Sequence, residues 1–302
     1  MTSQTELVDQ RAGQVAALSV IIASYNTRDL LCTCLESVFA STLEGKLEVF
    51  VVDNNSSDGT PEMVRREFPE AQVLVNDSNF GFAKANNQAL RRSTGRFVLL
   101  LNPDTKVPDS IFDEMCVFMD AHDEVGLAGV RLVRQDGSMD MACRRGFPTP
   151  ARALFRALML DRLSPRLFGG YNVLTRDPKG DYEVDAIVGA FMFFRRGMVE
   201  EVGFLDESFF MFGEDLDWCY RVKRANQKVM YLGSKEVLHV KGASVRQEQA
   251  KMNYHFHRSM LVFYRKHIDH HYPFFVGWLL SVGVGLRWVC KALLLPFRRS
   301  KQ

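Results

Sequence analysis

Short apolar runs alternate with stretches of helical periodicity between Leu18 and Met119. An apolar run of about 4–8 residues is typical of a strand buried on both faces, whereas apolar residues three or four apart are typical of a helix with one buried face. Strands and helices that alternate in this way predict an α/β fold, with a mostly parallel sheet and helices on both of its faces. The expected strands are Leu18–Ala23, Leu47–Asp53, Ala71–Val75 and Phe97–Asn102, and the expected helices are Leu30–Phe39, Thr60–Phe68 with Thr60 as N-cap, Phe82–Arg92 and Ile111–Met119.

The composition is that of a globular protein. Of 302 residues, 47% are hydrophobic and 25% are charged, which excludes a disordered, collagen-like or disulfide-scaffold chain. Lys and Arg number 38 against 36 Asp and Glu, so no basic field indicates nucleic acid as a partner. The six cysteines contain no C-x-x-C pair, and the first sixteen residues lack the apolar core of a signal peptide. We therefore expect a protein of the reducing cytosol.

The segment after the predicted α/β half is less regular. Residues 141–180 hold four of the ten prolines, and we expect a loop-rich insertion there with one helix at Ala151–Leu160. Regular structure is expected to return in an apolar run at Val184–Arg195, a helix at Glu214–Ala225, and two strands at Val229–Leu232 and Val237–Val240.

The C-terminal segment has the pattern of an amphipathic helix followed by an apolar tail. Basic residues recur every seven positions opposite apolar ones, and Tyr272–Leu286 is an uncharged run of fifteen residues that ends before Arg287 and Lys291. A membrane-spanning helix needs about 20 apolar residues. This run favours a helix that lies in the membrane interface with its bases toward anionic headgroups. An oligomer contact, a core helix and a true span are the alternatives. The bases of the first helix are Lys251, Arg258 and Arg265, opposite Met252, Phe256 and Phe263.

These patterns predict three parts. A polar tail covers residues 1–16, one α/β domain covers residues 17–246, and a helical, membrane-associating segment covers residues 247–302.

Polar loops follow the predicted parallel strands. The carboxyl ends of such strands meet at one edge of the sheet, where open α/β sheets bind ligands. We therefore expect the four loops to surround one ligand site. They are Ser24-Tyr25-Asn26, Asp53–Thr60, Asn79-Phe80-Gly81-Phe82 and Asn102-Pro103-Asp104.

This rim has no glycine-rich phosphate loop, since neither G-x-G-x-x-G after the first strand nor G-x-x-x-x-G-K-[ST] occurs. Carboxylates at the rim would instead receive a base, a sugar hydroxyl or a metal ion. Asp53 can accept a hydrogen bond from a pyrimidine or a ribose, and Asp104 can bind a divalent cation that bridges to a diphosphate. Turn capping is the alternative for Asp53 and for Asp58.

A second group of acids begins a predicted helix, where Phe209–Gly213 leads into Glu214, Asp215 and Asp217. The helix dipole favours acids at this position, but three acids in four residues exceed what capping requires. Because the preceding segment is apolar and aromatic, one of these acids can have a raised pKa and act as a general base. Asp217 is expected to be structural and paired with Arg221 one turn later.

His239 lies in a strand-like apolar run and precedes the loop Lys241–Arg246. A satisfied core histidine is the alternative to a metal-ligand or diphosphate-binding role. The other histidines lack a cysteine or carboxylate at a usual zinc spacing except for Asp269, so we expect a wet, membrane-facing surface rather than a zinc site. They are His255, His257, His267, His270 and His271.

Together these motifs resemble those of the inverting family 2 glycosyltransferases, which have the GT-A fold, and the resemblance covers Leu18 to Arg246. The Asn-Pro-Asp form is similar to the rhamnosyltransferase-like branch, which uses nucleotide-diphosphate sugars. The matching segments are Ser24-Tyr25-Asn26, Val52–Thr60, Asn79-x-Gly81-Phe82, Leu101–Asp104, Gly189–Met192, Gly213–Trp218 and His239-x-x-Gly242-x-Ser244.

The resemblance implies roles for individual residues. Asp215 matches the catalytic base, Asp104 the metal-binding acid of the D-x-D motif, and His239 a histidine that completes the metal site in some members, which implies Mg²⁺ or Mn²⁺ as cofactor. Asn102 stands where many members have the first acid of that motif, so the metal site carries less charge. Nucleotide-sugar binding is implied for Ser24, Tyr25, Asn26, Asp53, Asn79, Gly81, Asn102 and Asp104, and an acceptor-side position for Gly189, Ala190, Phe191 and Glu214.

The resemblance also implies the reaction: a single displacement that moves a sugar, L-rhamnose from dTDP-rhamnose as the expected donor, to a saccharide or a polyprenyl-diphosphate-linked acceptor. The enzyme would act at the inner face of the cell membrane as a peripheral protein. A sugar-phosphate nucleotidyltransferase is one alternative, but it should have a glycine-rich basic loop where Ser24–Thr27 stands. The other is a non-catalytic nucleotide-sugar-binding scaffold, in which Glu214–Asp217 would only cap a helix.

Overall fold

The computed structural model describes residues 16–157, 160–240 and 249–299. The predicted tail, apart from Ala16, and the loop Lys241–Arg246 therefore lie outside the described residues.

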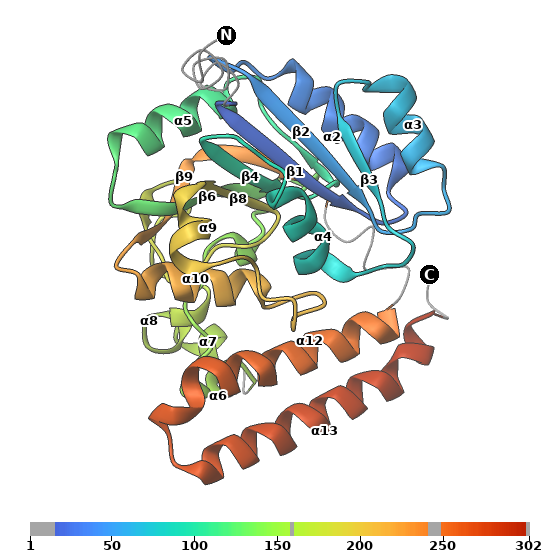
Figure 1. Ribbon diagram of the computed structural model, residues 1–302. Helices are drawn as coiled ribbons and strands as arrows, with labels where there is room; N and C mark the ends of the chain where they lie inside the picture. Colours follow the sequence, from blue (N-terminus) through green and yellow to red (C-terminus); the bar gives the residue numbers. More distant parts are fainter. Residues whose placement is uncertain (1–15, 158–159, 241–248, 300–302) are drawn as a thin grey trace, which may run out of the picture.

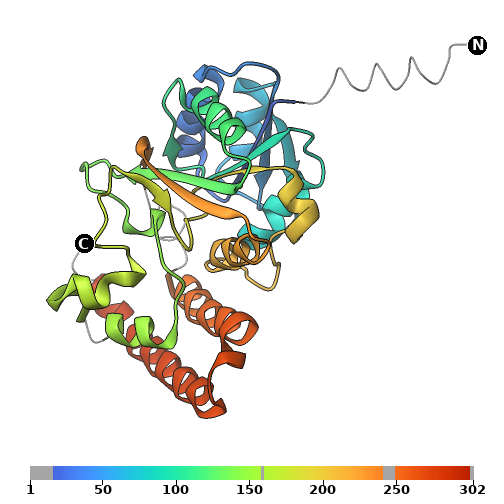
Figure 2. The same ribbon diagram turned by 90° about the vertical axis from the view of Figure 1, so that its left-hand side faces the viewer.

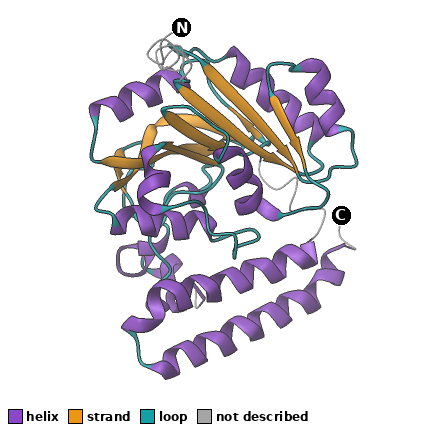
Figure 3. Ribbon diagram, in the orientation of Figure 1, coloured by secondary structure: helices purple, strands orange, loops and turns teal. Residues whose placement is uncertain are grey.

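One mixed sheet of nine strands forms the centre of the molecule, with helices around it (Figure 1; Figure 3). Its order is β3-β2-β1-β4-β8-β6-β9-β5, and β7 pairs with β9. The strands are β1 Leu18–Ser24, β2 Leu47–Asp53, β3 Gln72–Val75, β4 Phe97–Leu101, β5 Thr105–Lys106, β6 Val125–Val133, β7 Asp181–Glu183, β8 Phe191–Arg195 and β9 Lys228–His239. The helices around the sheet are α2 Arg28–Ala40, α3 Thr60–Glu67, α4 Gly81–Leu90, α5 Ile111–Ala121, α9 Gly197–Val202 and α10 Glu214–Arg224.

The N-terminal half confirms the predicted parallel arrangement. Strands β3, β2, β1 and β4 are parallel neighbours, and all five residues of β4 are buried, as the apolar run predicted. The register pairs Ser24 with Asp53 and Asp53 with Val75, so the polar loops begin at one edge. Figure 1 shows α4 in front of these strands and α2 and α3 behind them.

The second half of the sheet is mixed. Strand β8 is antiparallel to both β4 and β6, while β6 and β9 are parallel. The two strands predicted at Val229–Leu232 and Val237–Val240 are parts of the single strand β9, because β9 has only a register shift between Leu232 and Glu236. A bulge of this kind interrupts the apolar pattern without ending the strand.

Two local predictions need correction. The predicted helix in the insertion is three short helices, α6 Pro150–Ala157, α7 Leu160–Leu163 and α8 Pro165–Phe168. Thr60 is the first residue of α3, and the N-cap is Gly59 at φ +79°. Asp58 caps this turn by accepting hydrogen bonds from the backbone N–H and the hydroxyl of Thr60, as its turn-capping alternative predicted.

The C-terminal segment forms a helical hairpin below the sheet (Figure 1; Figure 2). Its long arms are α12 Gln249–Phe263 and α13 Phe274–Arg299, joined by the π-helical segment Tyr264–Ile268 and a short turn. Among the described residues, no helix has the length and apolar character that a membrane crossing requires.

Candidate active site

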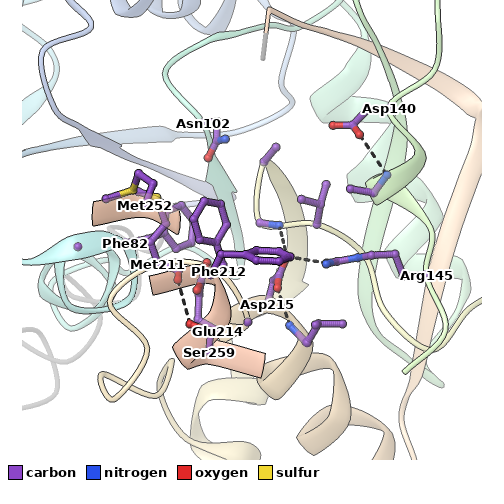
Figure 4. Close-up of a pocket in the computed structure, with 18 of the residues that line it drawn as sticks. Phe82, Asn102, Asp140, Arg145, Met211, Phe212, Glu214, Asp215, Met252 and Ser259 are labelled. Atoms are coloured by element: carbon purple, nitrogen blue, oxygen red, sulfur yellow. Dashed lines mark hydrogen bonds and ion pairs between the residues drawn. The ribbon is translucent and has the colours of Figure 1, made fainter. Parts of the chain in front are cut away.

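A cavity of about 670 Å³ opens at the carboxyl ends of the parallel strands (Figure 4). A volume of this size is usual for a small-molecule or cofactor site. Its walls bring together β-strand loops, the start of α10 and one face of α12. Most of the predicted site residues line it: Ser24, Tyr25, Asn79, Gly81, Asn102, Asp104, Gly189, Ala190, Glu214, Asp215 and His239.

Three predicted site residues lie outside the lining. Asn26 joins the first two rim loops, since its Oδ1 accepts the N–H of Ser57 at 2.8 Å and its own N–H donates to Ser56. Phe191 is 1% exposed and pairs with Leu101 in the sheet, so its side chain belongs to the core. The resemblance carried Phe191 over as part of a motif, but only its neighbours Gly189 and Ala190 reach the cavity.

Asp53 is fully buried at the end of β2, directly before the lining residue Asn54. Its Oδ2 accepts the N–H of Ser56 at 2.8 Å, whereas its Oδ1 has no hydrogen-bond partner among the described residues. Burial raises the pKa of Asp53, and the hydrogen bonds from Ser56 oppose that rise. An unsatisfied buried oxygen is costly, so a donor from a bound ligand would stabilise this position.

Asp104 and His239 face each other because their strands pair. Strand β5 is antiparallel to β9, with Thr105 opposite His239, and this register leaves Asp104 Oδ1 3.2 Å from His239 Nε2. On the other side of the imidazole, Nδ1 lies 3.6 Å from an Oδ of Asp140, a residue that the sequence analysis missed. Burial lowers the pKa of His239, but the two neighbouring carboxylates, Asp104 and Asp140, outweigh it and raise the pKa to about 9.

The possible metal ligands around Asp104 fit a divalent ion that takes only some of its ligands from the protein. Asp104 offers a carboxylate and Asn102 an amide oxygen, and His239 would offer an imidazole nitrogen once a bound ion displaces its proton; all three line the cavity. Within the described ranges, no group of three or more His, Cys, Asp or Glu side chains forms a metal cluster, and this includes the C-terminal histidines. Mg²⁺ is usually held by one or two carboxylates and completes its shell with water and substrate phosphates. The donor set suits that mode.

The acids of α10 lie across the cavity from Asn102 (Figure 4). The turn into this helix places Phe212 at φ +68° and Gly213 at φ +98°, and such strain is typical of functional loops. It is held from the other side by the rim loop at Gly81, whose φ is +80° and where a Cβ would lie 2.1 Å from the carbonyl oxygen of Phe210. Glycine at position 81 therefore allows the two loops to touch.

Asp215 accepts hydrogen bonds on both oxygens of its carboxylate. Its Oδ2 accepts hydrogen bonds from Arg145 Nη2 at 2.6 Å and from the N–H of Gly189 at 3.1 Å, and its Oδ1 accepts the N–H of Leu216 at 2.7 Å. Donors on both oxygens suit the ionised carboxylate, which only accepts hydrogen bonds. Asp215 is 5% exposed and lines the cavity, so a substrate hydroxyl can reach it.

Arg145 is a second site residue that the sequence analysis missed. Its backbone forms a bridge with Ala186, and its guanidinium also donates to the carbonyl oxygen of Ile187 at 2.6 Å. Arg144 and Arg145 lie in the loop-rich insertion. Two adjacent cations beside an apolar stretch were the only feature of the sequence that could have indicated a site residue here. The partner Asp215 is 70 residues away, so the sequence could not supply it.

Glu214 differs from Asp215 in its surroundings. The side chain is buried, and its Oε2 has no hydrogen-bond partner among the described residues. Burial and the neighbouring charge of Asp215 raise the pKa of Glu214 to about 8. Glu214 therefore lies beside a carboxylate, Asp215, whose two oxygens both accept hydrogen bonds, and two carboxylates in such different surroundings are the usual sign of an acid–base site.

Asp217 is structural, as predicted. Its carboxylate accepts hydrogen bonds from Arg221 Nε at 2.8 Å, Lys266 Nζ at 2.6 Å and His267 Nε2 at 2.7 Å. Burial raises the pKa of Asp217, but the bonds from His267, Arg221 and Lys266 outweigh it and lower the pKa to about 2. Asp217 thus connects α10 to the turn between α12 and α13.

The apolar face of α12 forms one wall of the cavity. Ser259, at the middle of that face, donates its hydroxyl to the carbonyl oxygen of Met211 at 3.1 Å and so ties the helix to the loop before α10. The helix predicted as part of a membrane-associating segment therefore also builds the site. Its lining residues are Met252, Phe256, Ser259, Met260 and Phe263.

The fold is that of the GT-A glycosyltransferases. Solved structures with this fold include GalNAc-T7 with UDP, GalNAc and Mn²⁺ (TM-score 0.55, 15% identity, 75% of this chain and 44% of that chain) and the mannosyltransferase PcManGT of Pyrobaculum calidifontis with GDP-Man and Mn²⁺ (0.55, 19%, 84% and 65%). A third is S. aureus TarS 1–349 with UDP (0.53, 17%, 81% and 65%). The chain spans about half to two thirds of the length of these structures.

The sequence model of glycosyl transferase family 2 matches residues 19–203, and the chain belongs to this family. It is 27% identical over 290 residues to an N-acetylglucosaminyl-diphospho-decaprenol L-rhamnosyltransferase of Mycobacterium tuberculosis, covering 92% of this chain and 90% of the relative. It is also 27% identical over 213 residues to the low-salt glycan biosynthesis hexosyltransferase Agl10 of Haloferax volcanii, covering 69% and 62%. The protein is a glycosyltransferase.

Proposed function

We propose that this enzyme transfers L-rhamnose from dTDP-L-rhamnose to a saccharide linked through a diphosphate to a polyprenol, with inversion at the anomeric carbon. The observation that carries the proposal is one cavity lined by both Asp104 and Asp215, from opposite parts of the chain. The similarity to the mycobacterial rhamnosyltransferase extends over 92% of this chain and supports the donor and acceptor classes.

In the proposed reaction Asp215 is the general base. The acceptor hydroxyl oxygen forms a bond to the anomeric carbon, its proton goes to Asp215, and the bond from that carbon to the diphosphate breaks. Arg145 and the N–H of Gly189 orient the carboxylate for this step. Since no side chain of the enzyme attacks the sugar, the configuration inverts once.

At the donor end, Asp53 is proposed to accept a hydrogen bond from the nucleotide base, beside Ser24 and Tyr25. Asp104 and His239, with Asn102 nearby, would hold Mg²⁺ or Mn²⁺. Such an ion neutralises charge on a leaving nucleoside diphosphate.

A panel of dTDP-, UDP- and GDP-sugars, each with and without Mg²⁺ or Mn²⁺, tests the proposal. Thermal shift reports binding and released nucleotide reports turnover. We expect turnover with dTDP-rhamnose and a polyprenyl-diphosphate-linked acceptor, at least about 100-fold less turnover for Asp215→Asn with donor binding retained, and weaker metal dependence for Asp104→Ala.

Asp136→Asn is the matched control, because Asp136 lies in an exposed turn away from the cavity. Donor binding without turnover in any combination would favour the non-catalytic scaffold. Full turnover by Asp215→Asn would remove the proposed base.

We also propose that the enzyme works at a membrane surface through α13. This helix exposes large apolar side chains three or four positions apart, with Phe274 at 89% and Trp278 at 65% exposure. Bases follow at Arg287 and Lys291. An apolar stripe beside cations is typical of a helix that lies in the interface. The other exposed large apolar residues of α13 are Phe275, Leu279, Val282, Leu286, Trp288 and Val289.

A further inference from the structure

The cavity has two chemically different ends. The strand-loop end is polar, whereas the end against α12 is built from flexible or aromatic apolar side chains. Methionine adapts its shape to irregular apolar ligands because it is unbranched and polarisable. The apolar end is lined by Met211 of the loop before α10 and by Met252, Phe256, Met260 and Phe263 of α12.

A sugar does not match this apolar end. Each buried sugar hydroxyl without a hydrogen-bond partner is costly. The hydroxyl of Ser259, the polar side chain within this face of α12, already donates to Met211. A hydrocarbon chain needs no such partner, so this end suits a hydrocarbon.

A cation lies beside this apolar surface. Four arginines line the cavity, and three of them have a carboxylate partner: Arg134 with Asp140 at 3.7 Å, Arg145 with Asp215 at 2.6 Å and Arg152 with Asp185 at 3.1 Å. The fourth, Arg287 of α13, is exposed and forms no ion pair with any residue of the described ranges. Its charge is available to a ligand, and a guanidinium matches phosphate oxygens in pairs.

The surroundings of Arg287 are positive and apolar together. Lys291, one turn later, lies with its Nζ 5.5 Å from the ring centre of Phe256. Burial lowers the pKa of His257, the hydrogen bond to the carbonyl oxygen of Asn253 opposes this, and the nearby charges of Lys291 and Arg287 lower the pKa further. An anion and a hydrocarbon are therefore favoured next to each other here.

We propose that the α12 end of the cavity binds the hydrocarbon chain of a lipid-diphosphate acceptor, and that Arg287 binds its diphosphate. The proposal rests on the proposed function for the acceptor class and adds the residues that recognise the lipid part. The C-terminal hairpin then has two surfaces: the outer face of α13 toward a membrane and the inner face of α12 toward the acceptor chain.

Direct binding of farnesyl diphosphate tests the site without any sugar transfer. Farnesol, which lacks the diphosphate, and inorganic pyrophosphate, which lacks the chain, are the matched ligands. Divalent cations are removed with a chelator, so that the diphosphate of the probe does not bind through a metal ion at the strand-loop end of the cavity. We expect the wild type to bind farnesyl diphosphate at least about tenfold more tightly than either fragment, a difference of about 1.4 kcal/mol.

Two variants locate the binding. Arg287→Gln should weaken farnesyl diphosphate about tenfold and change farnesol less than about twofold, because a charge-assisted hydrogen bond is lost. Phe256→Gln should weaken both chain-bearing ligands, and its partial exposure makes the substitution tolerable to the fold. Leu279→Gln, on the exposed face of α13, is the control and should leave all three affinities unchanged.

The inference is overturned if farnesyl diphosphate binds no more tightly than pyrophosphate, or if neither variant changes its affinity. Turnover of dTDP-rhamnose with a short, chain-free acceptor is measured in parallel. Turnover without farnesyl diphosphate binding removes this inference and leaves the proposed function. Binding that depends on Phe256 and Arg287, in the absence of any turnover, supports the lipid-diphosphate site and counts against the proposed function.

Discussion

The ion pair of Arg145 and Asp215 is the central contact at the scale of single residues. A buried carboxylate loses the stabilisation of water, and the guanidinium replaces it from a fixed direction. In this site that direction leaves the carboxylate turned to the cavity. Arg145 is thus a positioning residue, since it acts through Asp215.

Arg145→Ala should lower kcat/KM at least about 100-fold, because the carboxylate of Asp215 loses the donor that orients it, and misplacing a catalytic group by about 1 Å can cost about 100-fold in rate. Loss of the cation also disfavours the ionised carboxylate, so the acid limb of the pH–rate profile should move to higher pH. Arg145→Lys should recover part of the activity. Steady-state kinetics between pH 5 and 9 measure this, with Arg152→Ala as control, and an unchanged pH profile for Arg145→Ala would contradict the role.

The raised pKa of Glu214 predicts that the free energy of unfolding depends on pH. Its pKa is about 8 in the folded protein and near 4.3 when unfolded, so the folded state binds the extra proton between these values. The stabilising contribution of neutral Glu214 is complete below pH 4 and is lost as the pH rises to 8. The difference in unfolding free energy between wild type and Glu214→Gln should fall by up to about 1.4 kcal/mol per pH unit within this window. Urea unfolding at pH 5, 6, 7 and 8 measures it, and parallel curves would refute it.

The acids of the site could be predicted from the sequence because they follow local rules: each ends a strand or begins a helix. Arg145 and Asp140 could not, since both lie in or beside the irregular insertion. Their partners in the site, Asp215 and His239, lie 70 or more positions away, and no local pattern encodes such contacts.

At the scale of elements, β5 and β9 position the metal candidates. The parallel half of the sheet was predictable because each strand is a continuous apolar run between helices. The antiparallel pairing of the two-residue strand β5 with β9 was not, since two residues carry no periodicity. That pairing nevertheless determines that Asp104 meets His239.

Helix α10 carries Asp215 and is joined to the C-terminal hairpin through Asp217. Asp217→Asn should lower the free energy of unfolding by about 2 kcal/mol, less than for a fully buried pair because Lys266 is 37% exposed. Because the folded pKa of Asp217 is lowered to about 2, this stabilisation is present above pH 4 and is lost as the pH falls toward 2. Chemical unfolding at pH 7 and pH 3 measures it. Asp206→Asn is the control, since Asp206 pairs with the same Lys266 from a more exposed position.

At the scale of the whole molecule, the hairpin is where prediction and structure differ most. The sequence indicated an amphipathic helix and an apolar tail, and both are helical. The direction of each apolar face depends on tertiary packing, and α12 turns its apolar face to the cavity while α13 leaves a stripe exposed.

Membrane binding should depend on that stripe. We expect the wild type to co-sediment with vesicles that contain anionic lipid, and the double variant Trp278→Gln/Leu279→Gln to bind about tenfold more weakly, because two large apolar side chains no longer enter the interface. Val117→Gln removes an equally exposed apolar side chain from α5 and should change nothing. Equal sedimentation of all three proteins would exclude α13 as the attachment surface.

The cavity wall supplied by α12 has a consequence for how such enzymes diversify. The strand-loop end of the cavity is made mainly by residues 23–104, whereas much of the opposite wall comes from residues 252–287 of the hairpin. A chimera that receives residues 249–299 from a relative should therefore inherit that relative's choice of recipient and keep its own choice of activated sugar.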